Sequence, residues 1–221
     1  AKNSSNFIFS SSATVYGNCE DECVSEQTPL GTPLNPYGHT KSLGEKILSS
    51  GTHQFKTILL RYFNPVGAHP SALIGELPNG VPSNLVPFIT QAAAGIREKL
   101  MIFGDDYDTR DGTCIRDFIH VVDLAEAHVA ALKYSDTMME PLDVFNVGTG
   151  NGNTVMELIN TFQSENNLTL NYEIGPRRPG DIKAIFTDTS KIRSKLKWEN
   201  KYTLADSLKH SWAWEKKLRG L

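Results

Sequence analysis

The amino-acid sequence predicts an α/β protein built on a doubly wound, mostly parallel sheet. Two short apolar segments, at 7–9 and 57–63, have the composition of strands, and a helical segment at about 37–50 lies between them. A strand, a helix and a second buried strand in succession are typical of parallel α/β sheets. The composition supports a packed core, because 39% of the 221 residues are hydrophobic and 21% are charged.

The first 84 residues divide into strands, one helix and two loops. The segment 7–9 is typical of a short buried strand that ends in a polar, serine-rich loop. Prolines and acidic residues between 18 and 36 predict a surface loop. The apolar run at 57–63 predicts a buried strand, and the Pro, Gly and Asn content of 64–84 predicts an irregular segment that begins a second lobe.

The rest of the chain alternates strands and helices again. We expect helices at 85–97, 123–134, 155–165 and 203–218, with Asp123 capping the second. We expect strands at 100–103, 118–121, 144–147 and 170–174. Glycines at 148, 150 and 152 follow a strand, but G-x-G-x-G differs from the G-x-G-x-x-G of dinucleotide-binding loops, so we interpret them as a tight strand-to-helix turn.

Charge and hydropathy argue against several classes of function. The formal net charge is −3 and no basic tract stands out, so nothing indicates a nucleic-acid partner. No apolar run approaches the roughly 18 residues that cross a bilayer, so we expect no membrane partner. Cys19, Cys23 and Cys114 lack the spacing of a disulfide framework or a zinc site. We therefore expect reduced thiols, no metal and a cytoplasmic protein.

Tyr37 and Lys41 are the first candidates for chemistry. Residues four apart on a helix lie on one face, about one turn from each other. A phenol has a pKa near 10 and needs a shift of about 3 units, roughly 4 kcal/mol, to act as a base near neutral pH. A neighbouring ammonium favours the phenolate and so lowers that pKa.

A serine run at 10–12 raises the significance of this pair. The serines follow a predicted strand at its carboxyl end, which is the edge where open α/β sheets bind ligands. A hydroxyl at that edge can bridge a phenol and a substrate oxygen as a proton relay. The order of strand, serines, loop and Tyr-x-x-x-Lys helix is more specific than any of its parts.

Six motifs together resemble the UDP-glucose 4-epimerases of the extended short-chain dehydrogenase/reductase superfamily. The resemblance covers nearly the whole chain, with the motifs in the same order. The motifs occupy 11–17 (SSATVYG), 35–41 (NPYGHTK), 61–71 (RYFNPVGAHPS), 102–107 (IFGDDY), 111–121 (DGTCIRDFIHV) and 177–181 (RRPGD).

The resemblance implies a reaction, a cofactor and a set of site residues. Members keep NAD bound, remove a hydride from carbon 4 of the hexose and return it to the other face of a 4-keto intermediate. They thereby interconvert UDP-galactose and UDP-glucose. By position, Tyr37 matches the base, Lys41 the residue that binds the nicotinamide ribose and lowers the Tyr pKa, and Ser12 the hydroxyl that assists proton transfer. Phe63 falls beside the nicotinamide, and Ser12 and Tyr37 contact both cofactor and substrate. The other positions around the UDP-sugar are Asn64, Asn84, Leu85, Met101, Phe103, Arg116, Arg178 and Asp181.

The residue types agree with these implied roles. Arg116 and Arg178 suit a diphosphate, because guanidinium groups donate paired hydrogen bonds to phosphate oxygens. Each arginine taken alone also fits a surface salt bridge, Phe103 fits a core position, and Asp181 fits a turn cap. For His120 and Asp123 we favour structural roles. Ile185 occupies a variable position by the sugar, and its bulk predicts poor acceptance of N-acetylated sugars.

The resemblance also implies a domain organisation. We expect residues 1–63 to be the remainder of an NAD-binding Rossmann domain, and 64–221 to be mainly a UDP-sugar lobe, with about 115–155 returning to the Rossmann sheet. The family's glycine-rich phosphate loop has no equivalent before Ser12, and the chain begins with Ala rather than Met. We therefore expect an N-terminal part to be missing and this polypeptide alone to be inactive. A homodimer is implied by the resemblance.

Alternative functions remain open at this point. Sugar-nucleotide 4,6-dehydratases typically carry Asp-Glu after the loop Thr, whereas here Ala13, Thr14 and Val15 follow Ser12, which argues against dehydration. An epimerase of another UDP-sugar, one with a pentose, a uronate or an N-acetylhexosamine, fits the sequence better than a dehydratase does. A fragment that binds a nucleotide sugar without catalysis is the third possibility.

Overall fold

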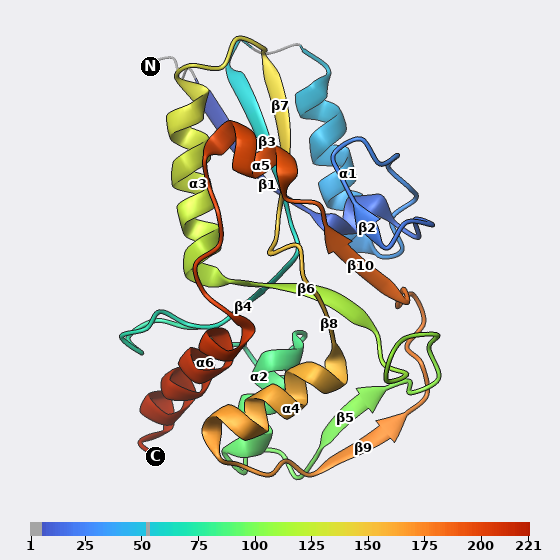
Figure 1. Cartoon of the computed structure of the whole chain (residues 1–221), viewed down its shortest axis with the longest axis vertical. Coiled ribbons are helices and arrows are strands. Elements are labelled where there is room, and N and C mark those ends of the chain that lie inside the picture. The colour runs from blue at the N-terminus through green and yellow to red at the C-terminus, as the bar shows by residue number, and fades with distance from the viewer. Residues whose placement is uncertain (1–5, 52–53) are drawn as a thin grey trace.

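A parallel three-stranded sheet forms the upper part of the molecule (Figure 1). The computed structural model describes residues 6–51 and 54–221. The strands lie in the order β1 (Asn6–Ser12), β3 (Lys56–Tyr62) and β7 (Leu142–Val147). Both pairings are parallel, with Ser11 beside Arg61 and Arg61 beside Asn146. The predicted α/β class with parallel strands is confirmed.

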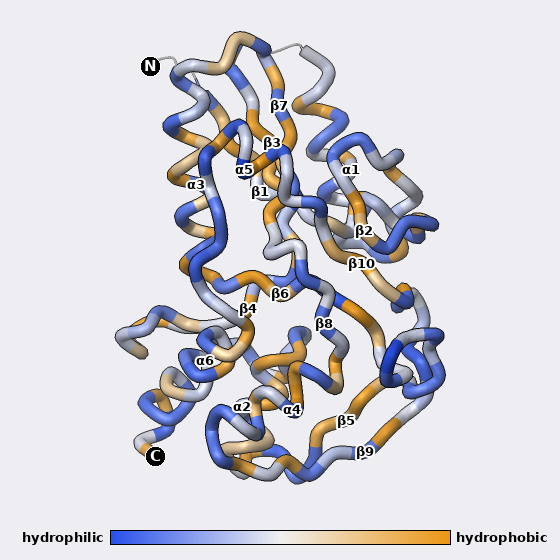
Figure 2. Tube along the Cα trace, in the orientation of Figure 1, coloured by the Kyte–Doolittle hydropathy of each residue, from blue (hydrophilic) through white to orange (hydrophobic). Residues whose placement is uncertain are grey.

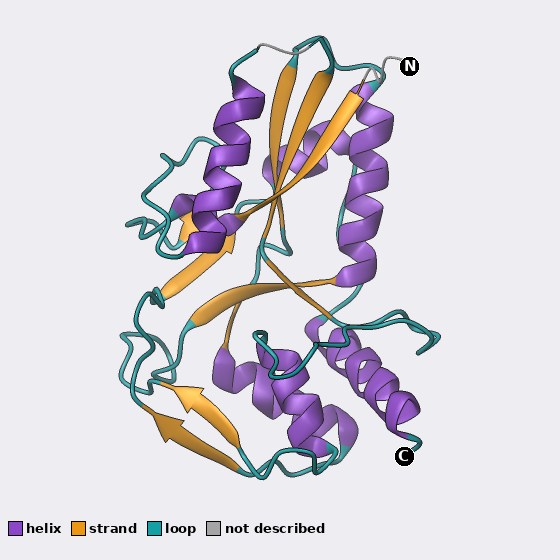
Figure 3. Ribbon diagram, turned by 180° about the vertical axis from the view of Figure 1, so that it is seen from behind, coloured by secondary structure: helices purple, strands orange, loops and turns teal. Residues whose placement is uncertain are grey.

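Helices cover both faces of this sheet, as the view from behind shows (Figure 3). Helix α1 (Pro36–Ser49) packs on β1, whereas α3 (Val121–Ser135) packs on β1 and β3 and α5 (Ser190–Leu196) packs on β7. The core between the sheet, α3 and α5 is apolar, with Ile58, Leu60, Ala127, Phe145 and Ile192 fully buried. Burial of these side chains supplies the main stabilisation of the upper part.

The first strand differs from its prediction in both length and burial. β1 continues through the serine run, so Ser10–Ser12 are strand residues and not a loop. Its first half is not buried, since Phe7 is 43% exposed. Within the described residues β1 pairs only with β3, so one edge of the strand is open and its leading residues are poorly covered.

A second sheet crosses the middle of the molecule. Its strands follow the order β2 (Cys23–Val24), β10 (Ala184–Thr187), β6 (Ile115–His120) and β4 (Asn64–Val66), and β8 (Gly152–Thr154) pairs antiparallel with β6. A short 3-10 helix, η1 (Ala13–Tyr16), follows β1. We did not predict β2, β4, β8, β10, η1 or α5, because segments of two to seven residues carry too little periodicity to be distinguished from loops.

Three helices and a two-stranded sheet form the lower lobe. The helices are α2 (Leu85–Ala93), α4 (Val155–Asn166) and α6 (Leu204–Arg219), and the strands β5 (Leu100–Phe103) and β9 (Tyr172–Gly175) are parallel. Figure 2 shows apolar stretches of α2, α4 and β5 in this lobe. Ile89, Ile102, Leu158, Phe162 and Leu208 are buried in one cluster that joins these elements.

Two predicted helix boundaries are wrong. Helix α2 ends at Ala93 instead of 97, because Gly95 adopts a φ of +71° and the next amides turn back to the Gln91 carbonyl. Helix α3 begins two residues earlier than predicted, with His120 as its N-cap. Asp123 lies inside the first turn and accepts hydrogen bonds from the backbone amides of Lys201 and Tyr202, at 3.1 and 3.0 Å.

The glycine-rich turn after β7 has a structural role, as the spacing of its glycines predicted. The buried carboxylate of Asp117, on β6, accepts hydrogen bonds from the backbone amides of Thr149 and Gly150, at 2.8 and 3.0 Å. A Cβ atom at Gly148 would lie 2.5 Å from Asp117 Oδ2, so only glycine allows this approach.

Across residues 6–51 and 54–221, we find no helix with the length and apolar character of a membrane span.

A pair of histidines joins α6 to the start of α3. Nδ1 of His120 accepts a hydrogen bond from the Val122 amide at 3.0 Å, so the His120 proton resides on Nε2, which is 3.0 Å from Nδ1 of His210. Tyr202 stacks on the His120 ring at a centroid distance of 4.2 Å. Burial and the neighbouring imidazole of His210 lower the pKa of His120 to about 4, although Asp206 opposes the shift. Protonation of His120 at Nδ1 would remove the acceptor of the Val122 amide, and protonation of His210 at Nδ1 would remove the acceptor of His120 Nε2.

We predict that the free energy of unfolding falls as the pH drops from about 7 to about 4.5. Over this range an unfolded imidazole binds a proton that folded His120 does not, so acid favours the unfolded chain, by on the order of 2–3 kcal/mol. Urea unfolding across this range measures the slope. His120→Gln, which cannot titrate, should flatten it, whereas His39→Gln on the exposed face of α1 should not. Equal slopes in wild type and His120→Gln would contradict the prediction.

Candidate functional site

The start of helix α1 presents the candidate base. Asn35 caps the helix by accepting a hydrogen bond from the Gly38 amide at 2.8 Å, and Pro36 occupies the first turn. Tyr37 follows directly, and its side chain is 49% exposed. Lys41 Nζ lies 5.4 Å from the centre of the Tyr37 ring and donates to the Ser10 carbonyl at 2.8 Å. The structure therefore places the ammonium beside the phenol, as the i, i+4 spacing predicted.

Ser12 lies at the carboxyl end of β1, where it begins η1. Its Oγ accepts a hydrogen bond from the Thr14 amide at 3.2 Å. Beside it on β3, Tyr62 is half-buried, and its pKa is raised first by burial and then by Tyr37. Ser12, Thr14 and Tyr62 line a cavity of about 180 Å³, which we call the Ser12 cavity. Tyr37 and Lys41 lie outside its lining, although Asn35 belongs to it.

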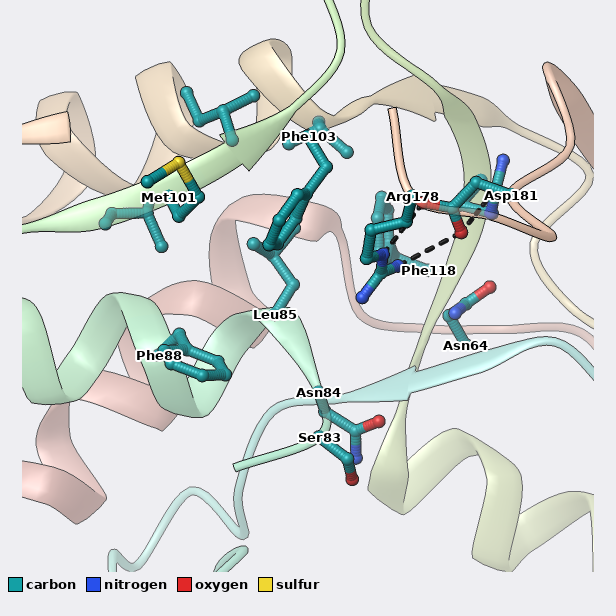
Figure 4. Close-up of a pocket in the computed structure, with 14 residues that line it drawn as sticks. Asn64, Ser83, Asn84, Leu85, Phe88, Met101, Phe103, Phe118, Arg178 and Asp181 are labelled. Atoms are coloured by element: carbon teal, nitrogen blue, oxygen red, sulfur yellow. Dashed lines mark hydrogen bonds and ion pairs between the residues drawn. The ribbon is translucent and has the colours of Figure 1, made fainter. Parts of the chain in front are cut away.

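A second cavity of about 260 Å³, the Arg178 cavity, adjoins the Ser12 cavity. Both are lined by Asn64, Arg116 and Asp181, so these three side chains stand between them. Figure 4 shows Met101 and Phe103 from β5 and Leu85 and Phe88 from α2 on one side of the Arg178 cavity, with Arg178 and Asp181 on the other. All eight predicted UDP-sugar positions other than Ser12 and Tyr37 line it: Asn64, Asn84, Leu85, Met101, Phe103, Arg116, Arg178 and Asp181.

The polar wall of the Arg178 cavity carries two cations and one anion. Arg178 donates to both carboxylate oxygens of Asp181, from Nε at 2.9 Å and from Nη2 at 3.1 Å. Arg116 Nη2 lies 3.7 Å from the same carboxylate. The hydrogen bond to Asp181 raises the pKa of Arg178. Guanidinium groups in proteins carry a positive charge at neutral pH. The net positive charge and the forked donors suit a diphosphate.

Sequence reasoning missed several apolar residues of the Arg178 cavity. Phe88 lies one turn after Leu85 on α2, and Phe118 lies two residues after Arg116 on β6. Both spacings place a side chain on the same face as a predicted residue, which is a signal that could have found them. Arg97 covers the Phe88 ring at 4.5 Å and fixes it at the cavity edge.

Phe63 and Ile185 are apolar residues that line the Ser12 cavity. Phe63 follows β3, and Ile185 lies on β10 beside Arg116. Both side chains are buried in one small cluster with Ala13, Val15 and Tyr16. The cavity thus has an apolar floor beneath the polar groups of Ser12, Asn64 and Asp181.

Comparison with known proteins assigns the chain to a family. The family model described as GDP-mannose 4,6 dehydratase matches residues 1–211. The chain belongs to this family. Within it, the chain is 46% identical over 213 residues to UDP-glucose 4-epimerase 4 of Oryza sativa subsp. japonica, and 47% identical over 211 residues to UDP-glucose 4-epimerase of Bacillus subtilis. These relatives confirm the resemblance to UDP-glucose 4-epimerases.

The solved structures agree with this assignment. UDP-glucose 4-epimerase from Bifidobacterium longum, in complex with NAD+ and UDP, superposes with a TM-score of 0.91 at 44% identity. The superposition covers 96% of this chain and 64% of that one. The rice and Bacillus alignments cover 95% and 94% of this chain but 58% and 62% of the relatives. The chain therefore spans about three fifths of the length of the curated relatives it matches.

We predict that Arg116→Met weakens the binding of inorganic pyrophosphate about 10- to 100-fold, because a desolvated guanidinium–phosphate contact is lost. Isothermal titration calorimetry at low ionic strength measures the affinity. Arg193→Met is the matched control, since Arg193 forms an exposed ion pair with Glu199 away from both cavities. An unchanged affinity in Arg116→Met would remove the diphosphate assignment of the cavity.

Proposed function

We propose that this chain carries the catalytic and UDP-sugar-binding residues of a UDP-glucose 4-epimerase that interconverts UDP-galactose and UDP-glucose with NAD. One observation carries the proposal. Eight positions, spread from Asn64 to Asp181 along the sequence, line a single cavity that adjoins the cavity of Ser12 and Phe63. The similar UDP-glucose 4-epimerase from Bifidobacterium longum, whose structure holds NAD+ and UDP, supports NAD and a UDP-linked molecule as the ligands. Within this proposal the protein is a cytoplasmic homodimer.

Lys41 and the residues that line the Ser12 cavity fit the nicotinamide end of NAD. Lys41 Nζ has three N–H groups, and its bond to the Ser10 carbonyl occupies one of them. Thr14 Oγ1 is buried on the Ser12 cavity without a hydrogen-bond partner among the described residues, so it can serve a bound molecule. Phe63 supplies an apolar surface beside these groups. NAD, when bound, supplies the hydride acceptor.

The chain's own residues then move the proton. Tyr37, as phenolate, takes the proton of the sugar 4-hydroxyl while the hydride leaves carbon 4, which yields a 4-keto sugar. Lys41 holds its ammonium 5.4 Å from the centre of the Tyr37 ring, where it stabilises negative charge that develops during the proton transfer. The Ser12 hydroxyl accepts a hydrogen bond from the Thr14 amide at the cavity wall, and its own proton serves the relay between the sugar oxygen and Tyr37.

The diphosphate and the nucleoside bind in the Arg178 cavity. Arg116 and Arg178 exchange part of their contact with Asp181 for phosphate oxygens. Phe103, Leu85 and Met101 offer the apolar surface that a uracil ring needs. This anchoring leaves the hexose in the Ser12 cavity, where its carbon 4 can present either face after rotation of the 4-keto sugar.

We predict that Tyr37→Phe lowers the kcat for UDP-galactose at least about 100-fold, because the phenol that removes the proton is lost. The assay follows UDP-glucose formation by the purified protein. Tyr172→Phe, on the exposed strand β9, is the matched control and keeps wild-type turnover. Retained activity in Tyr37→Phe would contradict the assignment of the base. Binding of UDP-sugar without any turnover by the wild type would favour a non-catalytic role.

We predict that Ile185 sets the size of sugar that is accepted. Its branched side chain fills part of the Ser12 cavity wall, so Ile185→Ala should raise turnover of UDP-N-acetylgalactosamine relative to UDP-galactose about 10-fold. A substrate panel that includes pentose and uronate nucleotides measures the ratio and tests the other UDP-sugars as alternatives. Ile174→Ala, on exposed β9, is the control. Equal turnover of the two hexoses by the wild type would disprove this role.

A further inference from the structure

A buried ion pair lies behind the candidate base, between α1 and β3. Arg61 donates to Glu45 from Nη2 at 2.7 Å and from Nε at 2.9 Å, and the two side chains are only 7% and 4% exposed. Removing two charges from water costs several kcal/mol per ion, which the attraction within the pair only partly offsets. The pair therefore contributes little net stability, so we look for its role in where it lies.

Every remaining polar group of this pair has a partner. Ser11 Oγ donates to Glu45 Oε1 at 2.5 Å, and Arg61 Nη1 donates to the Tyr16 hydroxyl at 3.2 Å. The Tyr16 hydroxyl lies 2.6 Å from Oδ1 of Asn146 on β7. One network thus connects α1, β1, β3, η1 and β7, and all of its side chains are buried. A fully satisfied buried network holds its members in a single arrangement.

The network lies one residue before the point where each strand reaches the site. In the parallel register Ser11 pairs with Arg61 and Ser12 pairs with Tyr62. Ser11 and Arg61 belong to the network, whereas Ser12 and Tyr62 line the Ser12 cavity. On α1, Glu45 follows Lys41 by four residues and Tyr37 by eight, so all three share one helix face.

The helix makes two successive contacts with β1 along this face. Lys41 Nζ donates to the Ser10 carbonyl, and Glu45 accepts from the next residue, Ser11. Between them the helix approaches the strand closely, since a Cβ atom at Gly44 would lie 2.6 Å from the Phe9 ring. The close approach sets the separation of helix and strand, and the directional bonds of Lys41 and Glu45 restrict their relative rotation and axial position.

We propose that Glu45 is a positioning residue for the reaction: held by Arg61 and Ser11, its carboxylate fixes the rotation and axial position of α1, and thereby the placement of Tyr37 and Lys41 relative to Ser12. The inference rests on the proposed function, in which Tyr37 transfers a proton at the sugar. An error of about 1 Å in such a group can lower the rate by two orders of magnitude. Glu45 itself touches no cavity wall.

The test compares Glu45→Gln and Glu45→Asp with Lys191→Met in the purified protein. Lys191 forms the partly buried ion pair with Asp143 on β7, remote from both cavities, so its removal controls for lost stability. Glu45→Gln should lower the kcat for UDP-galactose at least about 10-fold with the KM changed less than about 3-fold, because positioning rather than binding is lost. Glu45→Asp, which keeps the charge, should recover part of the lost kcat. Lys191→Met should keep the wild-type kcat even where its Tm falls as far as that of Glu45→Gln.

A second measurement separates this inference from the proposed function. Hydrogen exchange of the α1 amides at 37–45 should accelerate about 10-fold in Glu45→Gln, beyond the change in Lys191→Met. If the wild type turns over UDP-galactose and Glu45→Gln keeps the wild-type kcat, the positioning role is overturned while the proposed function stands. If the wild type has no epimerase activity, the proposed function fails. In that case, unchanged exchange in Glu45→Gln would overturn the positioning role as well.

Discussion

The buried carboxylate of Asp117 is the constraint on which the joining of the two lobes depends. It lies on β6 in the middle sheet and accepts hydrogen bonds from the turn after β7 and from the Thr187 amide on β10. Burial raises its pKa, whereas the hydrogen bonds from Thr149, Gly150 and Thr187 oppose that shift. A buried carboxylate without hydrogen-bond donors carries a large desolvation penalty, so Asp117 depends on the amides of this turn.

Because successive side chains of β6 point to opposite faces of the sheet, fixing Asp117 also fixes the residues of β6 that line the Arg178 cavity. Asp117 points toward the turn, so its neighbours Arg116 and Phe118 point to the other side of the strand and line the Arg178 cavity. β10 pairs in parallel with β6 and places Ile185 beside Arg116. The segment before β10 then delivers Arg178 and Asp181 to the same cavity. One buried residue therefore orients the strand that carries the cavity's central cation.

Long regular elements could be predicted from the sequence, and short ones could not. Strand β3 is predictable because Ile58, Leu59 and Leu60 are consecutive apolar residues, all of which the structure buries. Helix α1 is predictable because its 14 residues form a long element. Strand β1 was extended past its prediction, because a pairing with β3 and not the polarity of its serines decides its length. Helix α3 begins at Val121 because the His120 imidazole, and not the expected Asp123 carboxylate, caps it by accepting a hydrogen bond from the Val122 amide.

The cavity itself was beyond local reasoning. Arg116 and Arg178 are far apart in sequence, and only the pairing of β6 with β10 brings them together. Their grouping was predicted from motifs shared with a family, and not from spacing. Phe88 and Phe118 stand outside those predicted positions and were missed, although each shares a face with a predicted residue. The pair of Glu45 and Arg61 carries no local signature, because two charged residues on a helix and a strand predict solvent contact until the packing is known.

The three consecutive serines of β1 have identical side chains but make three different contacts. Ser10 reaches His128 on α3, Ser11 reaches Glu45 on α1, and Ser12 caps η1 at the cavity. Because successive strand side chains alternate between faces, a shift of one residue would leave the same letters in the alignment but exchange the contacts of both faces. An insertion or deletion within this run therefore cannot be located in an alignment, although it disrupts the structure. Alignments of related chains should accordingly be anchored on the flanking Phe9 and Ala13 and not on the serines.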